Sequence, residues 1–141
     1  MSWLRAAIAA FALSIALGQA GTAAAAGMSP EWVGAYGYED GRKAVAFYLS
    51  LSQNGEILTG HIEETQTFGR RSEDDTLRAK VVGSVDGHRV RFTKTYDGTG
   101  GQSHSVTYNG TLVVEGEFMF MFGTWRLGPD VGSWFASVTA D

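Results

Sequence analysis

The side chains that could do chemistry in this sequence recur at every second residue. Tyr36 and Tyr38 stand two residues apart, as do Lys94 and Tyr96, and Glu64 closes a third alternating segment. Because successive side chains of a strand point to opposite faces, each of these groups shares a face with the large apolar residues of its own segment. The candidate ligand-binding residues on this face are Tyr36, Tyr38, Glu64, Lys94, Tyr96, Tyr108 and Trp125.

Lys94 and Glu64 are charged residues on an otherwise apolar face, where an unpaired charge is costly to bury. We therefore expect them to form an ion pair, with tyrosine hydroxyls completing the hydrogen bonding. Three interpretations follow from the sequence. These groups line one end of a cavity and meet a polar or anionic ligand group, or they form a structural cluster that closes a barrel end, or Lys94 reaches solvent past the end of its strand.

Other reactive constellations are weak. The chain of 141 residues has no cysteine, which excludes disulfides, thiolate metal sites and a thiol nucleophile. His61 and Glu63 share a face, but a metal needs a third ligand, which neither His88 nor His104 is placed to supply. The neighbouring carboxylates Glu63 and Glu64 would face opposite sides of one strand. We assign no catalytic residue, no metal ligand and no cofactor.

The elements that must position these groups are strands. Eight segments alternate with period two, and turn signals separate them at Asp40-Gly41, Asn54-Gly55, Asp86-Gly87 and Glu115-Gly116. Asn109-Gly110 is an alternative turn, but it would leave a very short strand. Most links are short, which predicts antiparallel pairing of sequence neighbours. The expected strands are 31–39, 43–53, 56–64, 77–85, 88–96, 104–114, 117–127 and 132–139.

This pattern predicts an all-β fold, an eight-stranded antiparallel up-and-down barrel, with a β-sandwich as the alternative. Glycines inside the expected strands favour the barrel, because they permit sharp coiling or close approach of neighbouring backbones. These glycines are Gly34, Gly60, Gly83, Gly110 and Gly123.

Short motifs recur along the expected strands: Trp32-x-Gly34-x-Tyr36, Leu58-x-Gly60-x-Ile62, Val90-x-Phe92-x-Lys94-x-Tyr96, Val106-x-Tyr108-x-Gly110-x-Leu112 and Gly123-x-Trp125. Together they resemble the calycin-type barrels, which comprise lipocalins, fatty-acid-binding proteins and avidins. The resemblance implies a meander of eight strands with a ligand cavity at one mouth. It transfers no ligand-binding residue, because helix signals of the first two families are missing and only Trp125 and Trp134 stand where avidins have a run of tryptophans.

The first 26 residues have the features of a signal peptide. Arg5 precedes an apolar run from Ala6 to Leu17, and Ala24 and Ala26 form a small-x-small cleavage pattern. Removal of residues 1–26 would leave a single domain of residues 27–141 with 10 basic and 15 acidic side chains, a net charge of −5. We expect a periplasmic or secreted protein with no membrane anchor in its mature form and, given its acidity, no nucleic-acid partner.

Phe118, Phe120 and Phe122 make the second face of their strand as apolar as its first. Two explanations stay open: an ordinary strand buried on both faces, or an interface in a homo-oligomer.

These observations predict an exported, non-enzymatic barrel that binds a small molecule or a peptide or protein partner. One alternative is a structural or inhibitory barrel with a filled interior, which acts through its surface. The other is a cavity enzyme that uses lysine and tyrosine as general acids.

Overall fold

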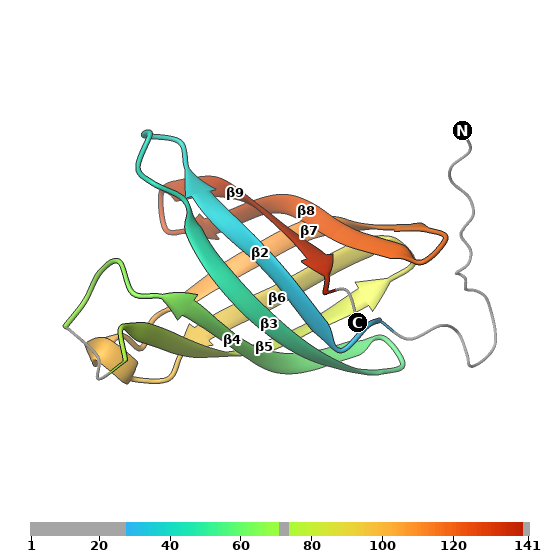
Figure 1. The fold of residues 1–141 in the computed structure, drawn as a ribbon, viewed down its shortest axis with the longest axis horizontal. Coiled ribbons are helices and arrows are strands. Elements are labelled where there is room, and N and C mark those ends of the chain that lie inside the picture. Colours follow the sequence, from blue (N-terminus) through green and yellow to red (C-terminus); the bar gives the residue numbers. More distant parts are fainter. Residues whose placement is uncertain (1–27, 71–73, 140–141) are drawn as a thin grey trace.

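The protein is a closed antiparallel barrel, seen in a computed structural model that describes residues 28–70 and 74–139. Each strand pairs with the next, and the first also pairs with the last, so the predicted up-and-down barrel is confirmed over the sandwich (Figure 1). The predicted signal peptide, residues 1–26, lies outside the described residues, as does Gly27. The strands are β2 (Glu31–Tyr38), β3 (Val45–Asn54), β4 (Ile57–Thr65), β5 (Thr76–Asp86), β6 (Arg89–Tyr96), β7 (Ser105–Glu115), β8 (Phe118–Leu127) and β9 (Asp130–Val138).

Tight hairpins close one end of the barrel. Gly55, Gly87 and Gly116 have φ angles of 63°, 61° and 60°, the left-handed conformation that these two-residue turns require. The predicted turn at Glu115-Gly116 is therefore confirmed. Gly110 instead lies within β7, opposite Gly123 of β8.

The glycines inside the strands allow close contact between backbones. A Cβ atom on Gly60 would lie 1.9 Å from the carbonyl oxygen of Ser50, and one on Gly123 would lie 1.9 Å from that of Asn109. No side chain fits at such distances, so the expectation of close backbone approach is confirmed.

The inward face carries the predicted alternating residues. Leu49, Leu58, Val90 and Met121 are fully buried, and the indole N–H of Trp32 donates to the carbonyl of Ser29, 2.8 Å away. Apolar side chains thus fill the barrel interior toward the tight hairpins.

The opposite end carries the longer connections, at the left of Figure 1. They are residues 39–44, 66–75 and 97–104, the last including a 3-10 turn, η1 (Thr99–Gly101). The amide of Arg70 donates to the carbonyl of Gly100 over 2.8 Å, so two of these connections are joined. The fourth connection, at Gly128, falls between the strands expected at 117–127 and 132–139, and Gly128 has a φ of 59°. No helix within residues 28–70 and 74–139 is long and apolar enough to cross a membrane.

Candidate functional site

A buried ion pair lies inside the barrel, below the end with the long connections. The Lys94 Nζ atom of β6 is 2.9 Å from Oε1 of Glu64 on β4. The two residues are 1% and 2% exposed to solvent. The predicted pair therefore forms, and the interpretation that Lys94 reaches solvent past its strand is wrong: the side chain stays inside, where Glu64 offsets the cost of burying its charge.

Two tyrosines complete the hydrogen bonding of the carboxylate. The hydroxyls of Tyr36 and Tyr96 donate to Oε2 of Glu64 over 2.7 and 2.8 Å. Lys94 also donates to the hydroxyl oxygen of Tyr96, 2.8 Å away. Glu64 thus accepts from three donors, and these hydrogen bonds offset part of the cost of burying the ion pair.

Aromatic rings surround the ammonium group. Lys94 Nζ lies 4.4 Å from the ring centroid of Tyr36, 4.6 Å from that of Tyr96 and 5.3 Å from that of Tyr108. The negative faces of such rings attract a cation. Burial lowers the pKa of Lys94, and the carboxylate of Glu64 opposes this change.

The tyrosine hydroxyls are held in their neutral form. Burial raises the pKa of Tyr36 and of Tyr96 far above the ordinary tyrosine value, and the nearby charge of Glu64 raises both further. Burial also raises the pKa of Tyr108, with smaller contributions from Tyr96 and Glu64. An anionic tyrosine would have to leave water and approach a carboxylate, so Tyr36 and Tyr96 act as hydrogen-bond donors.

A cavity of about 460 Å³ opens above this cluster at the barrel mouth. Its walls are mostly apolar or aromatic. The rings of Tyr38 and Trp125 meet edge to face with centroids 5.4 Å apart, and the indole N–H of Trp125 donates to the carbonyl of Gly37. The cavity is lined by Tyr36, Tyr38, Arg42, Lys43, Thr67, Phe68, Lys94, Tyr96, His104, Val106, Tyr108, Trp125, Leu127 and Asp130.

The structure brings together all seven residues that the sequence predicted. Six of them line the cavity, and Glu64 holds Lys94 from behind this lining. Their role in binding a ligand stays a prediction.

Sequence reasoning missed two aromatic rings of the wall. Phe68 comes from the polar connection 66–75, and its ring centroid lies 5.7 Å from that of Tyr96 and 6.0 Å from that of His104. Burial, and then the nearby Lys94, lower the pKa of His104. A single large apolar residue in a polar loop was the available signal for Phe68.

The mouth rim carries charges of both signs. Arg42 forms an ion pair with Asp40 at 2.8 Å, and its guanidinium carbon lies 3.9 Å from the ring centroid of Tyr38. Lys43 and Asp130 also border the opening. The rim is therefore polar while the wall below it is aromatic.

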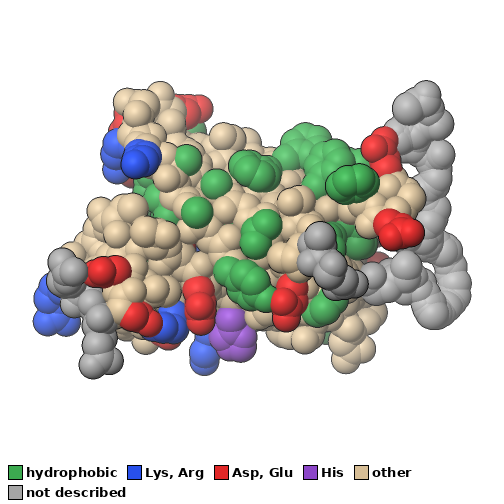
Figure 2. Space-filling model, viewed as in Figure 1, with side chains coloured by type: hydrophobic (Ala, Val, Ile, Leu, Met, Phe, Trp, Pro, Cys, Tyr) green, Lys and Arg blue, Asp and Glu red, His purple; other side chains and the backbone are tan. Residues whose placement is uncertain are grey.

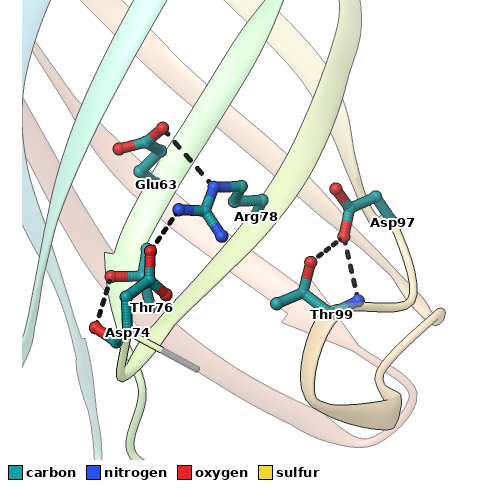
Figure 3. A network of polar contacts seen from close by, with 6 residues as sticks. All are labelled: Glu63, Asp74, Thr76, Arg78, Asp97 and Thr99. Carbon is teal, nitrogen blue, oxygen red and sulfur yellow. Dashed lines mark hydrogen bonds and ion pairs between the residues drawn. The ribbon is translucent and has the colours of Figure 1, made fainter. Parts of the chain in front are cut away.

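His61 and Glu63 lie on the outer surface of β4, away from the cavity. Glu63 is 3.6 Å from the Nε of Arg78, which also pairs with Asp74 (Figure 3). In the same view Asp97 accepts from the backbone N–H of Thr99, 2.9 Å away. These contacts fix the bases of two mouth connections.

No group of three or more His, Asp or Glu within the described ranges could hold a metal ion.

The phenylalanines of β8 lie on the outside of the barrel. Phe118 and Phe122 are 75% and 47% exposed, so the interpretation as a strand buried on both faces is wrong: nothing within the described chain covers this side of the sheet. Phe122 pairs with Phe135 of β9, which is 54% exposed and in turn lies opposite Ala35 of β2. Figure 2 shows apolar side chains gathered over β8, β9 and β2. We call Phe118, Phe120, Phe122, Phe135 and Val33 the outer apolar face.

Comparison of the sequence with models of protein families finds no match, and comparison with curated proteins finds none. The closed eight-stranded barrel is consistent with a calycin-like fold.

The ion pair yields a prediction about stability. Lys94→Met leaves Glu64 as a buried carboxylate without its counter-charge, which should lower the free energy of unfolding by about 3–5 kcal/mol. Urea denaturation followed by tryptophan fluorescence measures this. Lys80→Met on the exposed side of β5 is the matched control and should cost less than about 0.5 kcal/mol. The double change Lys94→Met with Glu64→Gln should regain part of the loss. A loss below about 1 kcal/mol for Lys94→Met would contradict a structural role for the pair.

The buried tyrosines yield a prediction about alkaline pH. Because the pKa values of Tyr36, Tyr96 and Tyr108 are raised in the folded state, these residues contribute their full stability at pH values below the unfolded tyrosine pKa of about 10. This contribution is lost as the pH rises further. The lowered pKa of Lys94 acts in the opposite sense, but only up to the unfolded lysine pKa of about 10.4. Above pH about 10.4, each of these tyrosines should lower the free energy of unfolding by up to about 1.4 kcal/mol per pH unit.

Urea denaturation at successive pH values from about 9 to 11.5 measures this slope. Tyr108→Phe should reduce it by at most about one third, since one of the three buried tyrosines that contribute to it is removed. An unchanged slope in this variant would show that Tyr108 ionises alike in the folded and unfolded states.

Proposed function

We propose that the mature chain is an exported, non-enzymatic barrel that binds a small molecule in the cavity at its mouth. The observation that carries this proposal is the cavity itself. Its volume of about 460 Å³ falls within the range of roughly 300–1,000 Å³ that is typical of small-molecule sites. Aromatic walls over a few fixed polar groups are the usual composition of such a site.

The state of the polar groups favours binding over catalysis. A general base needs a free carboxylate or amine, but Glu64 already accepts three hydrogen bonds and Lys94 is held by Glu64 and Tyr96. The raised pKa values of Tyr36 and Tyr96 oppose proton release at neutral pH. The likeness to calycin barrels, many of which carry ligands at one mouth, supports the same proposal, and the sequence features of residues 1–26 support export.

The uncharged fluorescent probe N-phenyl-1-naphthylamine tests for ligand binding. Its emission should rise on titration with the mature chain and saturate at one probe per chain. Leu127→Trp places a larger side chain in the cavity wall and so reduces the space for the probe, which should weaken binding about tenfold or more. Phe122→Ser on the outer side of the same strand is the control and should leave binding unchanged. If Phe122→Ser abolished the signal and Leu127→Trp did not, the probe would be reporting the outer apolar face and the cavity proposal would fail.

The outer apolar face favours a second role, and we propose that a second copy of the chain covers it. Large contiguous apolar patches are uncommon on monomers, and sheet faces pack well against each other. On the outward side of β8, β9 and β2, the charged side chains are Glu31 at one end of the strands and Arg126 at the other. The surface that lies between these two residues is uncharged, so a copy of the same face meets no charge repulsion there. The expected net charge of −5, from 10 basic and 15 acidic side chains, opposes an anionic membrane as the cover.

Sedimentation velocity over a range of concentrations tests this association. The mature chain should sediment as a dimer at high concentration, and the double change Phe122→Ser with Phe135→Ser should make it monomeric. Thr93→Ser, on the outer side of β6, serves as control and should leave the dimer intact. A wild-type chain that stays monomeric throughout, or a double variant that still dimerises, would overturn the proposal.

A further inference from the structure

Tyr108 has a buried hydroxyl with no hydrogen-bond partner in the described part of the chain. Its side chain is 1% exposed, whereas the hydroxyls of Tyr36 and Tyr96, which are nearly as buried, both donate to Glu64. Most buried polar atoms in proteins have a partner, and leaving one without a partner is destabilising. The exception therefore needs an explanation.

Packing does not provide one. The ring of Tyr108 stacks on Phe92 with centroids 4.8 Å apart and planes 8° apart, and Trp134 meets it edge-on at 5.5 Å. A phenylalanine ring would make the same contacts without burying a hydroxyl. The hydroxyl is thus costly for the fold alone, and Tyr108 lines the cavity.

A second donor at the cavity is also incompletely used. The ammonium group of Lys94 has three N–H bonds, and two of them donate, to Glu64 and to Tyr96. Only aromatic ring faces are available to the third among the contacts of the described residues. At the inner end of the cavity, the hydroxyl of Tyr108 and the third N–H of Lys94 therefore have no acceptor among the described residues. A ligand group that accepts hydrogen bonds would satisfy them.

The charge balance restricts this acceptor to an uncharged group. Lys94 and Glu64 neutralise each other, so a buried anion would leave one uncompensated negative charge close to the carboxylate. A cation would be repelled by the ammonium group of Lys94, which already neutralises the carboxylate. A carbonyl oxygen accepts hydrogen bonds without adding charge.

The aromatic walls of the cavity restrict the shape of the rest of the ligand. Tyr38 and Trp125 stand edge to face above the cluster, and Phe68 packs at 88° to Tyr96 on the wall. Ring surfaces arranged in this way suit a flat aromatic molecule, which can stack or meet them edge-on.

We propose that the cavity takes an uncharged, planar aromatic compound whose carbonyl oxygen, at the inner end, accepts a hydrogen bond from the hydroxyl of Tyr108. This inference rests on the proposed function, because it names the class of ligand for the same cavity.

Three matched probes test the inference: 2-acetylnaphthalene, its hydrocarbon analogue 2-isopropenylnaphthalene, in which C=CH2 replaces C=O, and the anion 2-naphthoate. Their affinities for the mature chain at pH 7 are measured by quenching of tryptophan fluorescence. We expect the ketone to bind about tenfold more tightly than the hydrocarbon, as one hydrogen bond provides, and more tightly than the anion.

Tyr108→Phe should bind the ketone and the hydrocarbon equally, and Tyr48→Phe, on the exposed side of β3, should retain the preference. Thermal unfolding of each variant shows whether it is folded. The comparison of probes on the wild-type chain needs no variant at all.

The possible results separate the inference from the proposed function. If all probes fail to bind, the proposed function and the inference both fall. If the wild-type chain binds ketone and hydrocarbon equally, or prefers the anion, the inference is wrong while the cavity remains a binding site. If Tyr108→Phe is folded and keeps the preference for the ketone, another donor is responsible and the assignment to Tyr108 is overturned.

Discussion

Lys94 and Glu64 face each other across a distance of 2.9 Å with almost no access to water, and the arrangement of the cavity floor follows from what such a pair requires. Two opposite charges in a barrel interior are tolerable only if their remaining donors and acceptors are also satisfied. Tyr36 and Tyr96 supply those hydrogen bonds, and their own burial keeps them protonated and able to donate. The pair therefore fixes the tyrosines, and the tyrosines fix the shape of the space above them.

The two ends of the barrel differ because their connections differ. Three glycine turns close one end tightly, and apolar side chains fill the interior beside them. At the other end the longer connections leave the mouth open, and one of them contributes Phe68 to the wall. The half of the barrel beside the tight hairpins is thus well packed and supplies stability in the absence of disulfides. The half beside the mouth has an interior that is partly open and is polar at its base.

The strand β8 illustrates how one sequence serves two surfaces. Met121 and Trp125 point inward, toward the core and the cavity, while Phe118 and Phe122 point outward and remain exposed. Apolar residues on an outer face contribute little to the stability of the single chain, and their exposure here is the observation behind the proposal that a second copy covers them. The cavity and the outer apolar face lie on opposite sides of the same sheet.

The amino-acid sequence was enough to predict the strands, three of the tight hairpins and the inward face with its seven candidate residues, because a period of two is a local property that each strand carries independently of its neighbours. It also indicated the pairing of Lys94 with Glu64, since burial of either alone would be too costly. Only closure of the barrel decided that Tyr36 meets Glu64, 28 residues away, that Phe68 joins the cavity wall, and that the hydroxyl of Tyr108 is left without a partner. The exposure of Phe118 and Phe122 was likewise decided by tertiary structure. Alternation along a strand identifies two faces, but which groups meet across the interior, and whether anything covers the outside, depend on how all eight strands are arranged around one axis.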